Sequence, residues 1–405
     1  MFYKRVTYIM LLLFIISLVL PFFSFAANDY IWSDDSVLAN ASSTKDENFN
    51  MKLESGAAIL IDQKSGEILY EYNAHEQLRP ASVTKVMTIL LIMEAIDSGK
   101  LSLDDRIPCS ENASAMGGSQ IWLDVREELT VNEMLKAICV VSANDCTVAM
   151  AEYLAGSEEA FVQQMNQKAK ELGMNDTVFK NCHGIDEDGH VTSAYDISIM
   201  SRELLNNHPS ITNYTTIWMD TLRDGKSQLV NTNKLLRTYT GATGLKTGST
   251  SLALYNLSAS ATRNDLSLIA VIMKAPTSAI RFEEAQKLLD YGFSNFSYTN
   301  LGKKGDIIKT ETVNKGLDKT VNLILEKDVG KIMKKGSGSD IVQEITINEN
   351  ISAPINKGDI LGNVTYTCPD GSKLQVNLVA ENSVDKINLW NMTTYLYDLW
   401  FNLFR

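Results

Sequence analysis

The chain has 405 residues, of which 45% are hydrophobic and 8% aromatic, and this composition excludes a disordered protein and favours two folded units. Its formal net charge is −12 without a compact basic patch, which disfavours binding to nucleic acid and to anionic lipid. The five cysteines are irregularly spaced and form no Cys-x-x-Cys pair. We therefore expect buried thiols, with no disulfide framework and no zinc site.

The amino terminus has the three parts of an export signal. Lys4 and Arg5 precede an apolar run from about Tyr8 to Phe23, and the small residues Ala26 and Ala27 follow. This order is typical of a signal peptide, which we place at residues 1–26. An uncleaved anchor is the alternative, although the run is short for a membrane-spanning helix. Residues 27–53 are expected to form a flexible spacer.

Residues 54–295 are predicted to form one domain with strands at both ends and helices between them. The expected strands are 57–62, 67–72, 243–248, 254–261 and 266–273. The expected helices begin near Pro80 and continue with 131–139, 147–155, 160–172, 194–205 and 279–291, the last one capped by Gly292. This order predicts an α+β domain in which an antiparallel sheet is assembled from both ends of the segment and flanked by helices.

The remaining residues divide into a small β-rich domain at 296–382 and an amphipathic helix at 383–405. Strands are expected at 320–325, 341–347, 362–366 and 373–380. On a helical wheel one face of the terminal helix carries Asn391, Asp398, Asn402 and Arg405, and the other carries Trp390, Trp400, Phe401 and Phe404. Such a helix suits the bilayer interface. Docking on the protein's own core or on a second subunit is the alternative, because the polar face has few cations.

A serine and a lysine stand one helical turn apart in Ser82-Val83-Thr84-Lys85. A serine nucleophile needs a base, and a lysine serves as one only if burial or a second cation lowers its pKa from about 10.4. The same spacing also occurs at Ser42/Lys45 and Ser383/Lys386. The motif is therefore weak evidence when taken alone.

Two further motifs follow in order and make the set specific. Ser142-Ala143-Asn144 comes first, and Lys246-Thr247-Gly248 then lies on a predicted strand. Ser-x-Asn recurs at Ser110/Asn112, but Lys-Thr-Gly occurs once. The combination of the three motifs is typical of penicillin-binding proteins and class A β-lactamases.

On these motifs the chain resembles low-molecular-weight penicillin-binding proteins of the serine-type D-alanyl-D-alanine carboxypeptidase family. The resemblance extends over nearly the whole chain and includes residues 79–82, 117–119, 155–161, 183–186, 189–190 and 287–293. Residues 219–225, 231–235 and 241–244 look most like the sporulation-associated subgroup. The resemblance implies a DD-peptidase-like catalytic domain, followed by the small β domain and the terminal helix.

The resemblance also implies catalytic roles. Ser82 would attack the carbonyl between two D-alanines, Lys85 would take its proton, and Ser142 would relay a proton to the leaving amine. The implied substrate-binding residues are Asn144, Lys246, Thr247, Gly248 and Ser249. Among them, Lys246 and Thr247 would face the terminal carboxylate, and the backbone N–H groups of Ser82 and Ser249 would form an oxyanion hole.

Some features depart from this pattern or compete with it. Ser249 and 252–256 replace the aromatic or His residue and the Ala-Gly-Tyr-Cys-like strand of many family members, which leaves substrate fit open. Cys146 lies close to the motif at Asn144 but is interpreted as packing. His183, Asp186, Asp188 and His190 cluster within one Gly-rich segment. We interpret that segment as a structural loop and expect no metal and no cofactor.

The expected function is removal of the terminal D-alanine from peptidoglycan stem peptides. Cleavage of cross-links by the same chemistry is the alternative, and a β-lactamase or a non-catalytic wall-binding protein is less favoured. Glu171 and Asn175 superficially fit the deacylation motif of a β-lactamase. The expected partners are the peptidoglycan pentapeptide, β-lactam antibiotics as covalent inhibitors and the outer face of the cytoplasmic membrane through the terminal helix.

Overall fold

The computed structural model describes residues 51–336, 340–388, 390, 392–393 and 400. The predicted signal peptide, nearly all of the predicted spacer and most of the predicted terminal helix lie outside these residues. The expectations for those segments therefore stay predictions.

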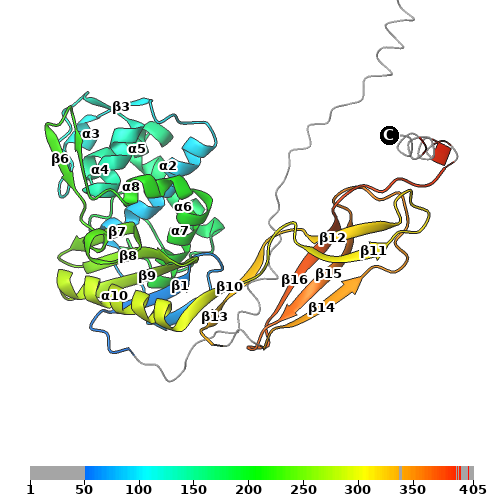
Figure 1. The fold of residues 1–405 in the computed structure, drawn as a ribbon. Helices are drawn as coiled ribbons and strands as arrows, with labels where there is room; N and C mark the ends of the chain where they lie inside the picture. Colours follow the sequence, from blue (N-terminus) through cyan, green and yellow to red (C-terminus); the bar gives the residue numbers. More distant parts are fainter. Residues whose placement is uncertain (1–50, 337–339, 389, 391, 394–399, 401–405) are drawn as a thin grey trace, which may run out of the picture. The chain divides into compact units, whose positions relative to one another are not determined.

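A five-stranded antiparallel sheet forms the centre of the first folded part (Figure 1). Its strand order is β2 (Ile68–Tyr72), β1 (Ala57–Asp62), β9 (Leu266–Ala275), β8 (Leu254–Arg263) and β7 (Ala242–Thr250). Strand β1 pairs with β9 so that Leu60 lies opposite Ala270. Both ends of the segment thus contribute to one sheet, as the sequence predicts.

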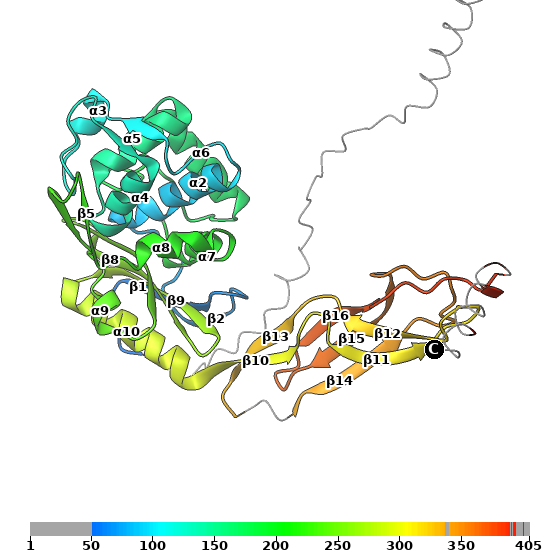
Figure 2. The same cartoon turned by 45° about the horizontal axis from the view of Figure 1, so that its top comes forward.

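Helices cover both faces of this sheet. Every residue of β1 is buried, and its side chains alternate between two cores: Ile59 belongs to the core under the helical layer, and Leu60 to the core under α10 (Ser278–Asn295). Figure 2 shows α10 and the short helix α9 (Leu235–Thr238) along one face and the remaining helices on the opposite side. Burial on both faces explains why β1 is apolar at nearly every position instead of alternating.

The prediction that Gly292 ends the last helix is wrong, because α10 continues to Asn295. A Cβ atom at position 292 would lie 2.4 Å from Leu268 Cδ1 and 3.0 Å from Leu60 Cδ2. Gly292 is therefore a close-approach residue, which allows the helix to pack tightly on the sheet.

The helical layer surrounds α2 (Lys85–Asp97), which is buried over most of its length. Its other long helices are α4 (Val131–Val140), α5 (Asn144–Ala155), α6 (Glu158–Glu171) and α7 (Ala194–Asn207). Its short helices are η2 (Ala81–Thr84), α3 (Glu111–Ser114), η3 (Pro209–Ile211) and α8 (Thr212–Thr215). Thr130 starts α4 with a capping box that includes Glu133.

Two small two-stranded sheets in this part were not expected from the sequence. They are β3 (Arg106–Pro108) with β4 (Glu128–Thr130), and β5 (Met219–Leu222) with β6 (Ser227–Val230). Only the second, of β5 and β6, is a hairpin. Their strands have only three or four residues, which is too short for a clear alternation of polar and apolar side chains.

The second folded part is all β. A five-stranded sheet has the order β11 (Ile307–Thr312), β12 (Thr320–Leu325), β16 (Lys373–Ala380), β15 (Ile360–Thr367) and β14 (Val342–Ile347). A two-stranded ribbon joins β10 (Phe296–Gly302) to β13 (Val329–Lys334). The sheet has its own apolar core, which includes Leu323, Val364 and Leu378. Helix α10 ends at Asn295 and β10 begins at Phe296, where the sequence suggests a domain boundary.

All five cysteines are buried free thiols, in agreement with the prediction for Cys109, Cys139, Cys146, Cys182 and Cys368. Within the described ranges, no helix combines the length and the apolar character needed to cross a bilayer.

Candidate active site

Ser82 and Lys85 lie at the start of the central helix of the catalytic part. Ser82 is in the short helix η2, and Lys85 is the first residue of α2. The Nζ atom of Lys85 lies 3.1 Å from Ser82 Oγ. It also donates to Asn144 Oδ1 at 2.6 Å and to the backbone oxygen of His183 at 2.7 Å. Three acceptors therefore fix the amine beside the hydroxyl.

The surroundings of Lys85 favour its neutral form. The side chain is fully buried, and this burial, reinforced by the charge of Lys246, lowers the pKa of Lys85 well below its ordinary value. A neutral amine can accept the proton of a serine hydroxyl. The site thus meets the condition that the sequence analysis sets for a lysine base.

Asn144 connects this pair to a loop on the other side. Its Nδ2 group donates to the backbone oxygen of Gly117, and its backbone N–H donates to that of Ser119, both at 2.7 Å. Gly118 has φ +77°, and a Cβ atom there would lie 2.9 Å from Asn144 Nδ2. The loop at 117–119 therefore orients the Asn144 amide, a role that the sequence analysis missed although it noted the segment.

Ser142 has an unfavourable conformation and an unpaired hydroxyl. Its φ is +66°, and its buried Oγ atom makes no hydrogen bond with any residue that the structure describes. A left-handed conformation costs a non-glycine residue about 1–2 kcal/mol, and a buried unpaired polar group costs roughly 1–3 kcal/mol. Strain of this kind is concentrated at functional sites.

Strand β7 brings the third motif against Ser82. A Cβ atom on Gly248 would lie 2.8 Å from the backbone oxygen of Pro80 and 2.9 Å from the backbone nitrogen atoms of Ser82 and Val83. Only glycine permits this approach of strand and helix. Ser249, the next residue, is exposed at this end of the strand.

Lys246 and Thr247 precede Gly248 on the strand. Lys246 is 1% exposed, and burial, with a smaller contribution from the charge of Arg281, lowers the pKa of Lys246 to about 7. The Thr247 hydroxyl shares a hydrogen bond of 2.6 Å with the hydroxyl of Thr232. The structure thus brings together residues of all three motifs, and Thr232 joins them, although its segment was noted in the sequence without a role at the site.

Arg281 of α10 binds the backbone of strands β7 and β8. It was not identified from the sequence. Its Nη1 group donates to the backbone oxygen atoms of Gly248 at 3.1 Å and Asn256 at 3.2 Å. The side chain of Asn256 in turn donates to the backbone oxygen of Arg79 at 2.8 Å. Arg281 and Asn256 therefore fix the position of β7 relative to the segment that leads to Ser82.

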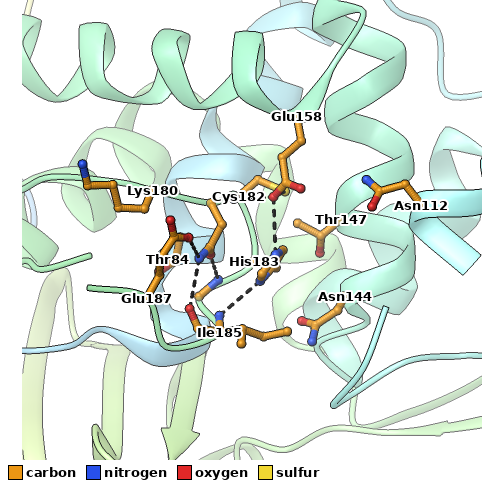
Figure 3. A network of polar contacts seen from close by, with 12 residues as sticks. Thr84, Asn112, Asn144, Thr147, Glu158, Lys180, Cys182, His183, Ile185 and Glu187 are labelled. Carbon is orange, nitrogen blue, oxygen red and sulfur yellow. Dashed lines mark hydrogen bonds and ion pairs between the residues drawn. The ribbon is translucent and has the colours of Figure 1, made fainter. Parts of the chain in front are cut away.

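The two histidines of the Gly-rich loop are held as neutral groups, and Figure 3 shows His183 with its partners Glu158 and Ile185. His183 Nδ1 accepts from the backbone N–H of Ile185, so its Nε2–H faces Glu158 Oε1 at 3.4 Å. His190 Nδ1 accepts from Lys180 N, and its Nε2 pairs with Thr84 Oγ1 at 2.8 Å. Burial lowers the pKa of His183 to about 3 and that of His190 to about 4.

These contacts favour the structural interpretation of the loop. Among the residues that the structure describes, no group of three or more His, Cys, Asp or Glu side chains is arranged to hold a metal ion. The loop nevertheless serves the site, because the backbone oxygen of His183 binds Lys85. A backbone contact of this kind leaves no mark in the sequence.

An antiparallel sheet flanked by helices, with a serine and a buried lysine at the start of the central helix, defines a serine hydrolase of the penicillin-binding-protein class. Comparison with known proteins specifies the family. Residues 41–277 match the family D-alanyl-D-alanine carboxypeptidase, and residues 296–386 match the C-terminal domain of penicillin-binding protein 5. The chain belongs to the D-alanyl-D-alanine carboxypeptidase family and is a serine-type hydrolase.

Individual relatives agree with this assignment. The D-alanyl-D-alanine carboxypeptidase DacF of Bacillus subtilis (strain 168) is 46% identical over 331 residues, which are 81% of this chain and 85% of the relative. Penicillin-binding protein 5 from Haemophilus influenzae is similar in structure, with a TM-score of 0.71 at 32% identity over 84% of this chain and 99% of that one. Penicillin-binding protein D2 from Listeria monocytogenes, solved in an ampicillin-bound form, has a TM-score of 0.56 at 32% identity over 60% of this chain and 99% of that one.

Proposed function

We propose that the protein removes the terminal D-alanine from peptidoglycan stem peptides through an acyl-enzyme on Ser82. The observation that carries the proposal is the buried Lys85 amine, 3.1 Å from Ser82 Oγ, in surroundings that lower its pKa. The family assignment gives the substrate class. The pair Ser82 and Lys85 supplies the nucleophile and the base.

Acylation needs one proton transfer in each direction. Lys85 accepts the proton of Ser82 as Oγ attacks the carbonyl carbon between the two D-alanines. The carbon–nitrogen bond then breaks, and Ser142 passes a proton from Lys85 to the leaving amine of D-alanine. Water, deprotonated by the same lysine, attacks the ester, which releases the shortened peptide and returns the proton to Ser82.

Five residues are proposed to hold the substrate. Asn144 orients the peptide amide, and the positive charge of Lys246, together with Thr247, faces the free carboxylate. The oxyanion is bound by the backbone N–H groups of Ser82 and Ser249, each worth about 3 kcal/mol of transition-state stabilisation. The close approach of Gly248 to Ser82 N supports this pairing, since it places the two donors on adjoining segments.

β-Lactam antibiotics are proposed to acylate the same serine. The similar protein from Listeria monocytogenes has been solved in an ampicillin-bound form. A β-lactamase activity is less favoured here. Glu171, its candidate deacylating residue, is half exposed on α6 and pairs with Lys168 and Gln167 of the same helix. Its carboxylate is therefore bound to neighbouring side chains on the surface of its own helix.

The segments at the two ends suggest where the enzyme works. We propose that residues 1–26 are a signal peptide, that 27–53 form a spacer and that 383–405 form an interfacial helix, which together attach the enzyme to the outer face of the cytoplasmic membrane. The proposed domains are 54–295 and 296–382, with the second acting as a spacer from the membrane. Deleting residues 296–382 without loss of action on intact sacculi would contradict the spacer role. A role in sporulation is proposed from the resemblance of residues 219–225, 231–235 and 241–244.

The test is to trap the acyl-enzyme and to identify the product. Mass spectrometry of the protein after reaction with benzylpenicillin should find the adduct on the peptide that contains Ser82, and Ser82→Ala should give none. Incubation with an uncross-linked pentapeptide and with a cross-linked dimer then separates the two activities. Release of D-alanine from the pentapeptide supports the proposal, whereas cleavage of the dimer alone would assign the enzyme as an endopeptidase.

A further inference from the structure

Trp122 is an exposed aromatic residue in an unfavourable backbone conformation. It is 74% exposed, and its φ is +56°. For a bulky residue the left-handed region costs about 1–2 kcal/mol and persists only where surrounding contacts impose it. Neither solubility nor core packing explains such a residue.

Asp145 fixes the backbone on both sides of Trp122. The buried carboxylate of Asp145 accepts from the backbone N–H groups of Ile121 and Leu123, each at 3.1 Å. Asp145 directly follows Asn144, whose side chain binds Lys85. The loop that carries Trp122 is therefore attached to the same helix start as the candidate active site.

The indole ring itself is also held. With the Gln120 amide oriented to satisfy both of its groups, its nitrogen donates to Met116 O at 2.7 Å and its oxygen accepts from Trp122 Nε1 at 3.2 Å. An exposed tryptophan whose N–H is already bonded retains an apolar ring for a ligand. Because the ring and the backbone are both fixed, binding of a ligand would cost little conformational entropy at Trp122.

Arg223 connects this loop to the hairpin of β5 and β6. Its guanidinium donates to both oxygen atoms of Glu127, at 2.6 and 2.9 Å, and to the backbone oxygen atoms of Ile121 at 2.8 Å and Trp122 at 3.2 Å. Arg223 follows β5, in the segment that the sequence analysis singled out without assigning it a role. It is a positioning residue, because it reaches Trp122 only through the backbone.

The hairpin that carries Arg223 also reaches the substrate end of the site. After β6, Thr232 bonds to Thr247 of β7 and to the backbone oxygen of Val140. The hairpin lies beside the helical layer in both views (Figures 1 and 2). The loop with Trp122 is thus held at two points of the site. One is Asn144, and the other, reached through the hairpin of β5 and β6, is Thr247.

We infer that Trp122 is a fixed contact for the stem peptide. The contact is with the peptide residues on the amino-terminal side of the last three, which are D-Ala-D-Ala and the residue before them. The backbone oxygen of Ser119 accepts a hydrogen bond from the backbone N–H of Asn144. Trp122 follows Ser119 by three residues, so at most about 11 Å of extended chain separates the two. That is the length of about three peptide residues, so the contact is within reach of residues that a tripeptide substrate lacks.

A peptide fits this loop better than a neutral sugar does. Arg126, four residues beyond Trp122, is exposed and makes no ion pair with any described residue. A cation on the same loop as an exposed ring suits a peptide that carries a carboxylate. This inference rests on the proposed function, since it assigns a further contact for the same substrate.

The test compares two substrates of different length. The full-length protein, in detergent, is assayed for D-alanine release from N-acetyl-Lys-D-Ala-D-Ala and from the free pentapeptide Ala-Glu-Lys-D-Ala-D-Ala. Trp122→Ala is expected to lower the ratio of kcat/KM values, pentapeptide over tripeptide, by about 10-fold, mainly through KM, as apolar burial of one side chain implies. Trp122→Phe should restore most of that ratio.

Arg223→Ala is expected to lower the same ratio, and Arg223→Lys should not rescue it, because a lysine lacks the planar fork. Lys168→Ala and Tyr153→Ala serve as controls, since they remove a similarly buried ion pair, that of Lys168 with Glu94, and an exposed aromatic residue elsewhere. An unchanged ratio in Trp122→Ala would overturn the inference, as would an equal loss on both substrates. A loss confined to a pentapeptide that carries the disaccharide would assign the ring to the sugar instead. If the wild type released no D-alanine from either substrate, the proposed function would fail independently of Trp122.

Discussion

The amine of Lys85 lies 3.1 Å from the hydroxyl of Ser82 and is bonded at the same time to Asn144 and to the backbone of His183. All acceptors around it are neutral. Among the residues that the structure describes, no carboxylate lies within hydrogen-bonding distance of this amine, so burial dominates the pKa of Lys85. This arrangement makes several outcomes predictable.

The pH dependence of D-alanine release should reflect the protonation states of two lysines. D-Alanine release needs neutral Lys85 and charged Lys246, so kcat/KM should rise as Lys85 loses its proton and fall again as Lys246 loses its proton. The pKa of Lys246 is about 7 in the free protein. A bound carboxylate favours the charged lysine, so the falling limb in kcat should lie at higher pH than that in kcat/KM. Steady-state kinetics between pH 5 and 10 measure both limbs.

Lys246→Arg is the control for this profile. A guanidinium stays charged across the range, so the falling limb should disappear while the rising limb remains. A kcat/KM value of the wild type that kept rising to pH 10 would contradict the role given to Lys246.

Ser142→Gly should separate stability from activity. Glycine adopts φ +66° without strain and removes a buried hydroxyl that lacks a partner in the described structure. The free energy of unfolding should therefore stay unchanged or rise by about 1 kcal/mol. D-Alanine release should fall by about 100-fold or more through loss of the proton relay. Denaturant unfolding and a D-alanine assay measure the two effects.

Asp265→Gly is a matched control, because Asp265 also has a positive φ, +65°, but lies in the turn between β8 and β9. It should change stability in the same direction and leave activity unaltered. Full activity in Ser142→Gly would remove Ser142 from the mechanism.

Gly248→Ala should disrupt the site by steric means alone. The added methyl group would lie within 3 Å of Pro80 O, Ser82 N and Val83 N. We expect the second-order rate constant of penicillin acylation to fall by more than about 10-fold, and the free energy of unfolding to fall by about 1–3 kcal/mol. Gly117→Ala, where a Cβ atom meets nothing within 4 Å, should retain acylation. Equal rates in the two variants would refute the close packing of β7 on the helix start.

His183→Gln tests whether an imidazole takes part in the chemistry. His183 binds Lys85 through its backbone oxygen, and its ring faces Glu158, so acylation by penicillin should stay within about fivefold of wild type. A general base would lose about 10²–10⁴-fold. Stability should fall by about 1–2 kcal/mol, because buried hydrogen bonds are lost. A loss of acylation without a loss of stability would argue for a catalytic histidine.

The sequence predicts the parts of this protein that depend on short-range spacing. Ser82 and Lys85 stand one turn apart, and that alone places their side chains on the same side of the helix start. The strands at both ends of the catalytic part were recognisable from their apolar residues, and strands β12 and β16 begin and end where the sequence places them. Local patterns of this kind need no tertiary information.

Contacts through the backbone and between distant residues were beyond the sequence. The carbonyl groups of Gly117 and His183 hold Asn144 and Lys85, and any residue type supplies a carbonyl group. Arg281 reaches β7 from α10, a partnership that only the packed fold creates. Gly292 was misassigned as a cap because a glycine near the end of a helix has two uses, and only the sheet beneath it decides between them.

The most direct test of the account is D-alanine release from N-acylated Lys-D-Ala-D-Ala by the full-length protein and by Ser82→Ala. The account predicts steady release by the wild type and none by the variant, with both proteins folded by circular dichroism. Undiminished release by Ser82→Ala would contradict it, because the acyl-enzyme on Ser82 is the step on which every other assignment depends.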